Sequence, residues 1–161
     1  MGQGNIVSRE LQELVQGVED LPVPVPPDLK PLVLLLAGST APLGFPSPAE
    51  DFNTEPVDVM KKLMPYPQSM FLLRVRGHSM REDGIFDDDI LVVSKAIKPK
   101  SGHVVVALIE SEFTVKRLHL LNGRMRLRAA NPTYPDIVPK DGETVQIWAV
   151  ATGLIRFLVK V

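Results

Sequence analysis

Residues 104–130 read VVVALIESEFTVKRLHLLNGRMRLRAA, and this stretch indicates the fold class. It contains three runs of apolar and β-branched residues, with the turn dipeptide Asn122-Gly123 before the third. Such runs between turn residues predict strands, here over residues 104–110, 113–120 and 124–130. The same criteria predict strands over residues 70–76, 90–94, 145–151 and 154–159. Short strands at this spacing, with little helix between them, predict a mainly β fold of antiparallel strands.

The chain before these strands has a different character. We expect residues 1–43 to form a flexible N-terminal arm and residues 44–161 to form the β-rich body. A short helix in the arm is indicated by a Ser8 cap and by apolar residues at helical spacing, Leu11, Leu14, Val15 and Val18. Prolines predict extended backbone over residues 21–27 and 41–48. Residues 58–64 predict one or two helical turns before Pro65.

The composition of the chain argues against several classes of function. The 161 residues carry a net charge of −1, which argues against bulk electrostatic binding to DNA or to anionic membranes. The absence of cysteine excludes disulfides and thiolate metal sites. The longest apolar run, Leu32 to Ala37, is far shorter than the ~20 residues of a membrane span. The acidic N-terminus lacks the basic start of a secretory signal, so we expect a cytoplasmic protein with no membrane attachment.

Ser79 and Lys116 are the residues that most directly suggest chemistry. Ser79 follows Gly77-His78 in a turn after an apolar run, and Lys116 lies within a predicted strand. Alternation places Thr114, Lys116 and Leu118 on one face of that strand, but the pattern does not decide which face is buried. If this face is buried, desolvation lowers the pKa of Lys116. A neutral lysine could then take the proton of a nearby serine hydroxyl.

The histidines offer competing sites. His78 is adjacent to Ser79, so its side chain is expected to diverge from the serine. His119 could instead complete a Ser–His–Asp triad, because triads are defined by geometry and not by chain order. His103 and His119 could contribute to a zinc site, although no third ligand stands out.

Two clusters of charged residues can be explained without a catalytic or metal site. The acidic residues of the first lack the ligand pattern of a calcium loop and predict a solvated turn: Asp83, Asp87, Asp88 and Asp89. The basic residues of the second alternate on one strand and predict an exposed, charge-protected face: Arg124, Arg126 and Arg128. A docking surface for an acidic partner is the alternative for the second cluster.

Three motifs, in order and at matching spacing, resemble the LexA/UmuD family of self-cleaving serine–lysine peptidases. They are Gly-Phe-Pro-Ser-Pro-Ala at residues 44–49, Gly-His-Ser-Met at 77–80 with Asp-Asp-Asp-Ile-Leu-Val-Val at 87–93, and Glu-Phe-Thr-Val-Lys-Arg-Leu at 112–118. The resemblance covers about residues 43–152, and it points in particular to UmuD and its plasmid-borne relatives.

The resemblance implies a LexA/signal-peptidase-like β-rich body and a Ser/Lys pair that needs no cofactor or metal. Ser79 would be the nucleophile and Lys116 the general base, with backbone amides of His78 and Ser79 forming the oxyanion hole. The implied role is in the SOS response to DNA damage, where a RecA filament on single-stranded DNA stimulates self-cleavage. The shortened homodimer would then act with a UmuC-type Y-family translesion polymerase and with the sliding clamp, without sequence-specific DNA binding of its own.

The position of the cut has two candidates. The family motif places it at Leu43–Gly44, although relatives usually carry cysteine or alanine before the bond. Ala37–Gly38 resembles the Ala–Gly cut of LexA-type repressors but lies six residues earlier. Two rival functions stay open: a polymerase accessory that never cleaves, and a LexA-type or phage-type regulator. The second would need a helix-turn-helix for which the 43-residue arm has no room.

Overall fold

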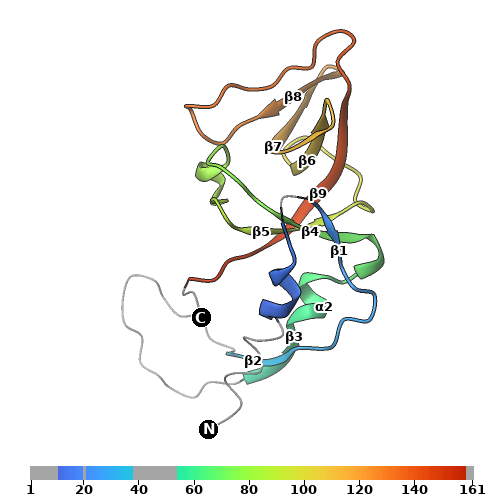
Figure 1. Cartoon of the computed structure of the whole chain (residues 1–161), viewed down its shortest axis with the longest axis vertical. Helices are drawn as coiled ribbons and strands as arrows, with labels where there is room; N and C mark the ends of the chain where they lie inside the picture. The colour runs from blue at the N-terminus through green and yellow to red at the C-terminus, as the bar shows by residue number, and fades with distance from the viewer. Residues whose placement is uncertain (1–10, 20, 38–53, 159–161) are drawn as a thin grey trace.

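The computed structural model describes residues 11–19, 21–37 and 54–158, which form one large and one small antiparallel β-sheet (Figure 1). The larger sheet has seven strands in the order β1-β4-β5-β9-β6-β7-β8. They are β1 (Val23–Pro24), β4 (Met70–Arg74), β5 (Ile90–Ser94), β6 (Val104–Ile109), β7 (Glu112–Leu121), β8 (Arg124–Arg128) and β9 (Val145–Ile155). Each pair of neighbours is antiparallel, so the predicted fold class is confirmed.

The last strand differs from the sequence prediction. Residues 145–151 and 154–159 were expected to form two strands, but β9 continues without a break through Gly153. Its register shifts against β5 between Val92 and Val93, which accommodates the irregularity. A Cβ atom at residue 153 would lie 2.7 Å from the Cδ1 atom of Leu63. Gly153 therefore packs closely against the end of the Leu63 side chain inside a strand, where the sequence analysis left a break between two strands.

The smaller sheet pairs β2 (Val33–Ala37) with β3 (Thr54–Asp58), and neither strand was predicted. The short helix α2 (Val59–Leu63) follows β3, as the sequence indicated. Its N-terminus is capped by Asp58, whose carboxylate accepts from the Lys61 N–H at 3.1 Å. Two short 3₁₀ helices complete the elements, η1 (Pro67–Ser69) and η2 (Arg81–Asp83).

The described part of the arm packs onto the body. Residues 11–16 are helical, which confirms the helix predicted from apolar spacing. Val18 and Val25 are 1% and 3% exposed, and the arm's buried residues share a core cluster with Met64, Leu72 and Val92 of the body. β1, within the proline-rich stretch, pairs with β4 at the edge of the larger sheet, where prolines are tolerated. Ser8, residues 41–48 and the boundary between residues 43 and 44 lie outside the described residues.

Two further clusters support the two segments of the candidate site. One cluster, which includes Val75, Met80, Val93 and Val106, anchors the loop that follows β4. The other, which includes Val105, Leu118 and Leu127, lies along β6, β7 and β8. No helix within the described ranges is long and apolar enough to span a bilayer.

Candidate active site

The loop after β4 presents Ser79 and is fixed at several points. Gly77 adopts a φ of 89°, a left-handed conformation that favours glycine, and its N–H donates to the Asp87 carboxylate at 2.7 Å. Met80, the next residue after Ser79, is 2% exposed in the core. Ser79 itself is half-buried.

Lys116 lies on the buried face of β7. Its side chain is 7% exposed, and Leu118 on the same face is 1% exposed. The buried face of β7 is therefore the face that carries Lys116, a point that strand alternation alone did not decide. A buried lysine loses the hydration that stabilises its ammonium form, and burial lowers the pKa of Lys116 from the usual 10.5.

The structure brings the two residues together. Lys116 Nζ lies 2.9 Å from Ser79 Oγ, 3.0 Å from Thr114 Oγ1 and 3.0 Å from the Val115 carbonyl oxygen. All three partners are neutral oxygen atoms, so none of these contacts adds a negative charge that would favour the ammonium form. The Val115 carbonyl can only accept, and it therefore fixes one Nζ proton.

The same geometry serves the neutral amine. When Nζ carries two protons, one bonds to the Val115 carbonyl and the lone pair can accept from the Ser79 hydroxyl. This arrangement is a proton acceptor in contact with a latent nucleophile, which is what general-base activation of serine requires. Thr114 is the third residue in contact with Lys116 Nζ. Strand alternation placed it on the same face as Lys116 but suggested no role for it.

A cavity of about 260 Å³ lies beside the Ser79 hydroxyl. Its walls are formed by residues at the end of β4 and in the following loop, and by residues at the start of β7: Leu73, Arg74, Val75, Arg76, Gly77, Ser79, Met80, Phe113, Thr114 and Val115.

The competing histidine sites are not assembled. His119 lines a separate cavity with Asn122, Arg124 and Val138. His103 accepts from the Lys100 N–H through its Nδ1 atom. Within the described ranges, no group of three His, Cys, Asp or Glu side chains is arranged to hold a metal ion.

The acidic cluster is the exposed turn that the sequence predicted at Asp87 and Asp88, but not at Asp89. Asp89 is 3% exposed, and its carboxylate accepts from the Phe86 N–H and from the Arg156 guanidinium. Asp88 pairs with Arg74 at 2.8 Å. The interpretation was wrong for Asp89 because its partner, Arg156, lies 67 residues away in the sequence. The paired carboxylates stabilise the segment that supports the Ser79 loop.

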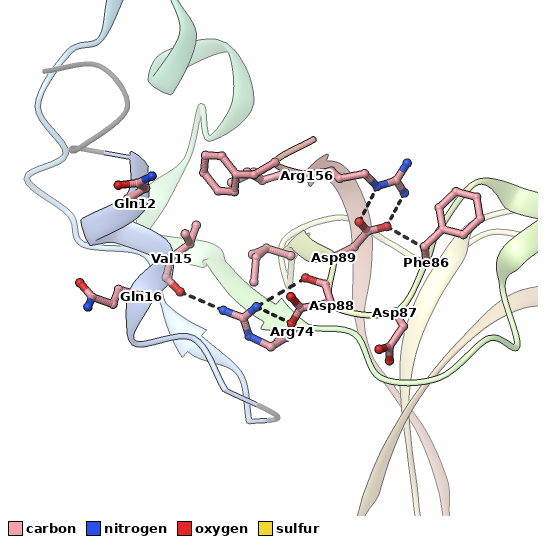
Figure 2. A pocket seen from close by; sticks show the side chains of 12 residues that line it. Gln12, Val15, Gln16, Arg74, Phe86, Asp87, Asp88, Asp89 and Arg156 are labelled. Carbon is pink, nitrogen blue, oxygen red and sulfur yellow. Dashed lines mark hydrogen bonds and ion pairs between the residues drawn. The ribbon is translucent and has the colours of Figure 1, made fainter. Parts of the chain in front are cut away.

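A larger cavity of about 710 Å³ lies between this acidic segment and the arm helix (Figure 2). Figure 2 shows Arg74 between the two, and its guanidinium donates to Asp88 and to the carbonyls of Val15 and Val18, the latter at 2.7 Å. Arg156 is paired with Asp89 and lies over the Phe86 ring. Arg74 therefore joins the arm to the body, whereas the Arg156 contacts lie within the body.

The alternating arginines of β8 are exposed, as predicted. Arg126 and Arg128 share the carboxylate of Asp136, at 3.7 and 3.6 Å. They lie on an edge strand of the larger sheet, where charge discourages pairing with other chains.

The family of the chain follows from its similarity to known proteins. Residues 35–152 match the peptidase S24-like family. Because this match covers more than half of the chain, the protein belongs to that family, the LexA/UmuD family of self-cleaving serine peptidases.

Individual relatives include both UmuD-like proteins and repressors. The protein SamA of Salmonella typhimurium is 42% identical over 73% of this chain and 86% of its own length. The protein MucA of Escherichia coli is 40% identical over 68% of this chain and 75% of its own. The LexA repressor of Paracidovorax citrulli is 38% identical over 81% of this chain, which spans only 57% of that repressor.

Proposed function

We propose that the protein cuts its own arm at Leu43–Gly44, with Ser79 as nucleophile and Lys116 as general base. The observation that carries this proposal is the 2.9 Å contact between a buried lysine amine and the serine hydroxyl. Both residues occupy the positions that the family motifs assign to these roles. Leu43 and Gly44 lie outside the described residues, and their assignment rests on the motif alone.

The proposed reaction follows from the contacts of Lys116. Neutral Lys116 takes the proton of Ser79, and Oγ attacks the carbonyl carbon of Leu43. Backbone N–H groups at His78 and Ser79 stabilise the oxyanion. The protonated lysine then gives its proton to the Gly44 nitrogen, which leaves residues 1–43 esterified to Ser79 until water releases them. Because the cleavage segment belongs to the same chain, its effective concentration is high.

We further propose that the protein acts in the SOS response. In this proposal a RecA filament on single-stranded DNA stimulates the cut, and the processed homodimer is an accessory subunit of a UmuC-type translesion polymerase, in contact with the sliding clamp. The support is the similarity to SamA and MucA and the family motifs. The similarity to LexA repressors keeps a regulatory role as the alternative.

Fragment masses after incubation with RecA, single-stranded DNA and a nucleotide test this proposal. We expect a fragment that begins at Gly44, and none from the Ser79→Ala variant. A fragment that begins at Gly38 would instead identify the Ala37–Gly38 bond. An intact wild-type chain would contradict self-cleavage and support the accessory function.

The packing of the arm predicts that cleavage and release are separate events. After a cut at Leu43, residues 11–37 would keep their buried side chains and the pairing of β2 with β3. We expect the cut fragment to remain bound in native mass spectrometry. Arg74→Met should promote its loss, because the carbonyls of Val15 and Val18 then lose their donor.

Arg126→Met is the matched control for this experiment, because Arg126 lies on β8 and pairs with Asp136. This control should retain the fragment as the wild type does. A wild-type protein that loses the fragment as soon as it is cut would show that the arm contacts are too weak to hold it.

A further inference from the structure

Asn131 is a buried polar residue that the reaction described above does not use. Its side chain is 6% exposed, and it lies in the loop after β8. Asn131 Nδ2 donates to the His78 carbonyl oxygen at 2.8 Å. Asn131 Oδ1 accepts from the N–H and the hydroxyl of Thr133, at 3.1 and 2.9 Å. A buried carboxamide with both ends hydrogen-bonded has one defined orientation.

The orientation of this carboxamide follows from its partners. The backbone N–H of Thr133 can only donate, so the Asn131 oxygen must face it. The NH₂ group is consequently turned toward the His78 carbonyl, which can only accept. The two partners lie on different segments, and Asn131 therefore ties the loop after β8 to the loop that carries Ser79.

The His78 carbonyl and the Ser79 N–H belong to the same peptide group. This group is planar and trans, so its N–H points away from its carbonyl oxygen. A donor that holds the carbonyl on one side therefore directs the N–H to the opposite side. The second peptide group of Ser79 is held in the same way, because its carbonyl accepts from the Ala130 N–H at 2.8 Å.

We infer that Asn131 is a positioning residue that directs the Ser79 N–H toward the oxyanion of the reaction. This inference rests on the proposed function, because it assigns a role within the same site. Oxyanion donors are effective when they are aimed in advance at the developing charge. Without the Asn131 contact, the His78 carbonyl keeps only the longer bond from the Arg81 N–H, at 3.4 Å, so the 78–79 peptide group is held less firmly, although Ser79 and Lys116 keep their own contact.

The variant Asn131→Asp removes the Nδ2 donor of Asn131 and changes little else in the shape of the side chain. The aspartate has nearly the same size and still accepts from Thr133, but its carboxylate presents an oxygen to the His78 carbonyl. We expect self-cleavage to slow by about 10- to 100-fold, less than the 10²–10³-fold effect of deleting an oxyanion donor outright. The rates are compared on the plateau at high pH, because a new carboxylate near the Ser79 loop also favours the ammonium form of Lys116.

Thr133→Ala is the matched control, because it removes a partner of Asn131 and leaves the His78 contact in place. It should cleave at close to the wild-type rate. Labelling of Ser79 by diisopropyl fluorophosphate provides a second readout that needs no arm. Its rate should fall in Asn131→Asp, and it should stay unchanged in the control. Thermal unfolding identifies any variant that is not folded.

The outcomes separate this inference from the proposed function. A folded Asn131→Asp protein that cleaves and labels like the wild type would overturn the positioning role and leave the Ser79–Lys116 assignment intact. A wild type that neither cleaves nor labels would overturn both. If Asn131→Asp does not fold, an NMR measurement on the wild type tests the positioning contact instead. It measures the scalar coupling across the hydrogen bond, between Asn131 ¹⁵Nδ2 and the His78 carbonyl ¹³C. A detectable coupling supports the contact, and its absence contradicts it.

Discussion

Lys116→Met should lower the self-cleavage rate by at least about three orders of magnitude, as losses of catalytic groups that act as a unit do. Methionine has a similar length and fills the same buried space, but it offers no basic nitrogen to Ser79. Lys116→Arg should be equally inactive, because a guanidinium stays protonated and cannot accept the serine proton. The measurement is the rate of fragment formation by intact mass.

The fold should survive the loss of Lys116. Its burial disfavours the charged form in the folded state, so Lys116→Met should unfold at the same temperature as the wild type or at a higher one near neutral pH. Lys98→Met is the control, because Lys98 is exposed and should be replaceable without effect. A Lys116→Met protein that cleaves within tenfold of the wild type would refute the role of general base.

The cleavage rate should increase with pH, because only the neutral form of Lys116 accepts a proton. Below the pKa of Lys116, each pH unit raises the neutral fraction, and thus the rate, about tenfold. Above this pKa the rate should reach a plateau. Since burial lowers the pKa of Lys116, the plateau should begin at a lower pH than the value of 10.5 for an exposed lysine would allow.

First-order rates between pH 6 and pH 10, measured without RecA, check this dependence. Ser79→Ala should remain uncut at every pH, which excludes cleavage by hydroxide. A rate that does not change over this range would show that no group with the expected pKa is involved.

The sequence predicted most strands of the larger sheet because their β-branched runs are bounded by turn residues. Its main error there, the division of β9 at Gly153, arose because a glycine can mark either a turn or a close contact. Leu63, which causes that contact, lies 90 residues away in the chain. The strand β2 was missed because its apolar run follows a proline-rich arm and carries no alternation.

The candidate site was predicted in part. The motifs identified Ser79 and Lys116, but alternation could not show which face of β7 is buried, because both faces carry apolar residues. The pairing of Asp89 with Arg156 and the contact of Asn131 with His78 join segments distant in the sequence. No local pattern indicates such contacts, so they were found only in the folded chain.

The central claim is that Lys116 is uncharged when it acts on Ser79. An NMR titration of the Lys116 ε-carbon in the wild-type protein, compared with the pH dependence of its cleavage rate, tests this claim most directly. We expect the ε-carbon to titrate below pH 10.5, with a midpoint equal to that of the rate. A lysine that titrates at or above pH 10.5, or at a pH that differs from the kinetic midpoint, would contradict the account.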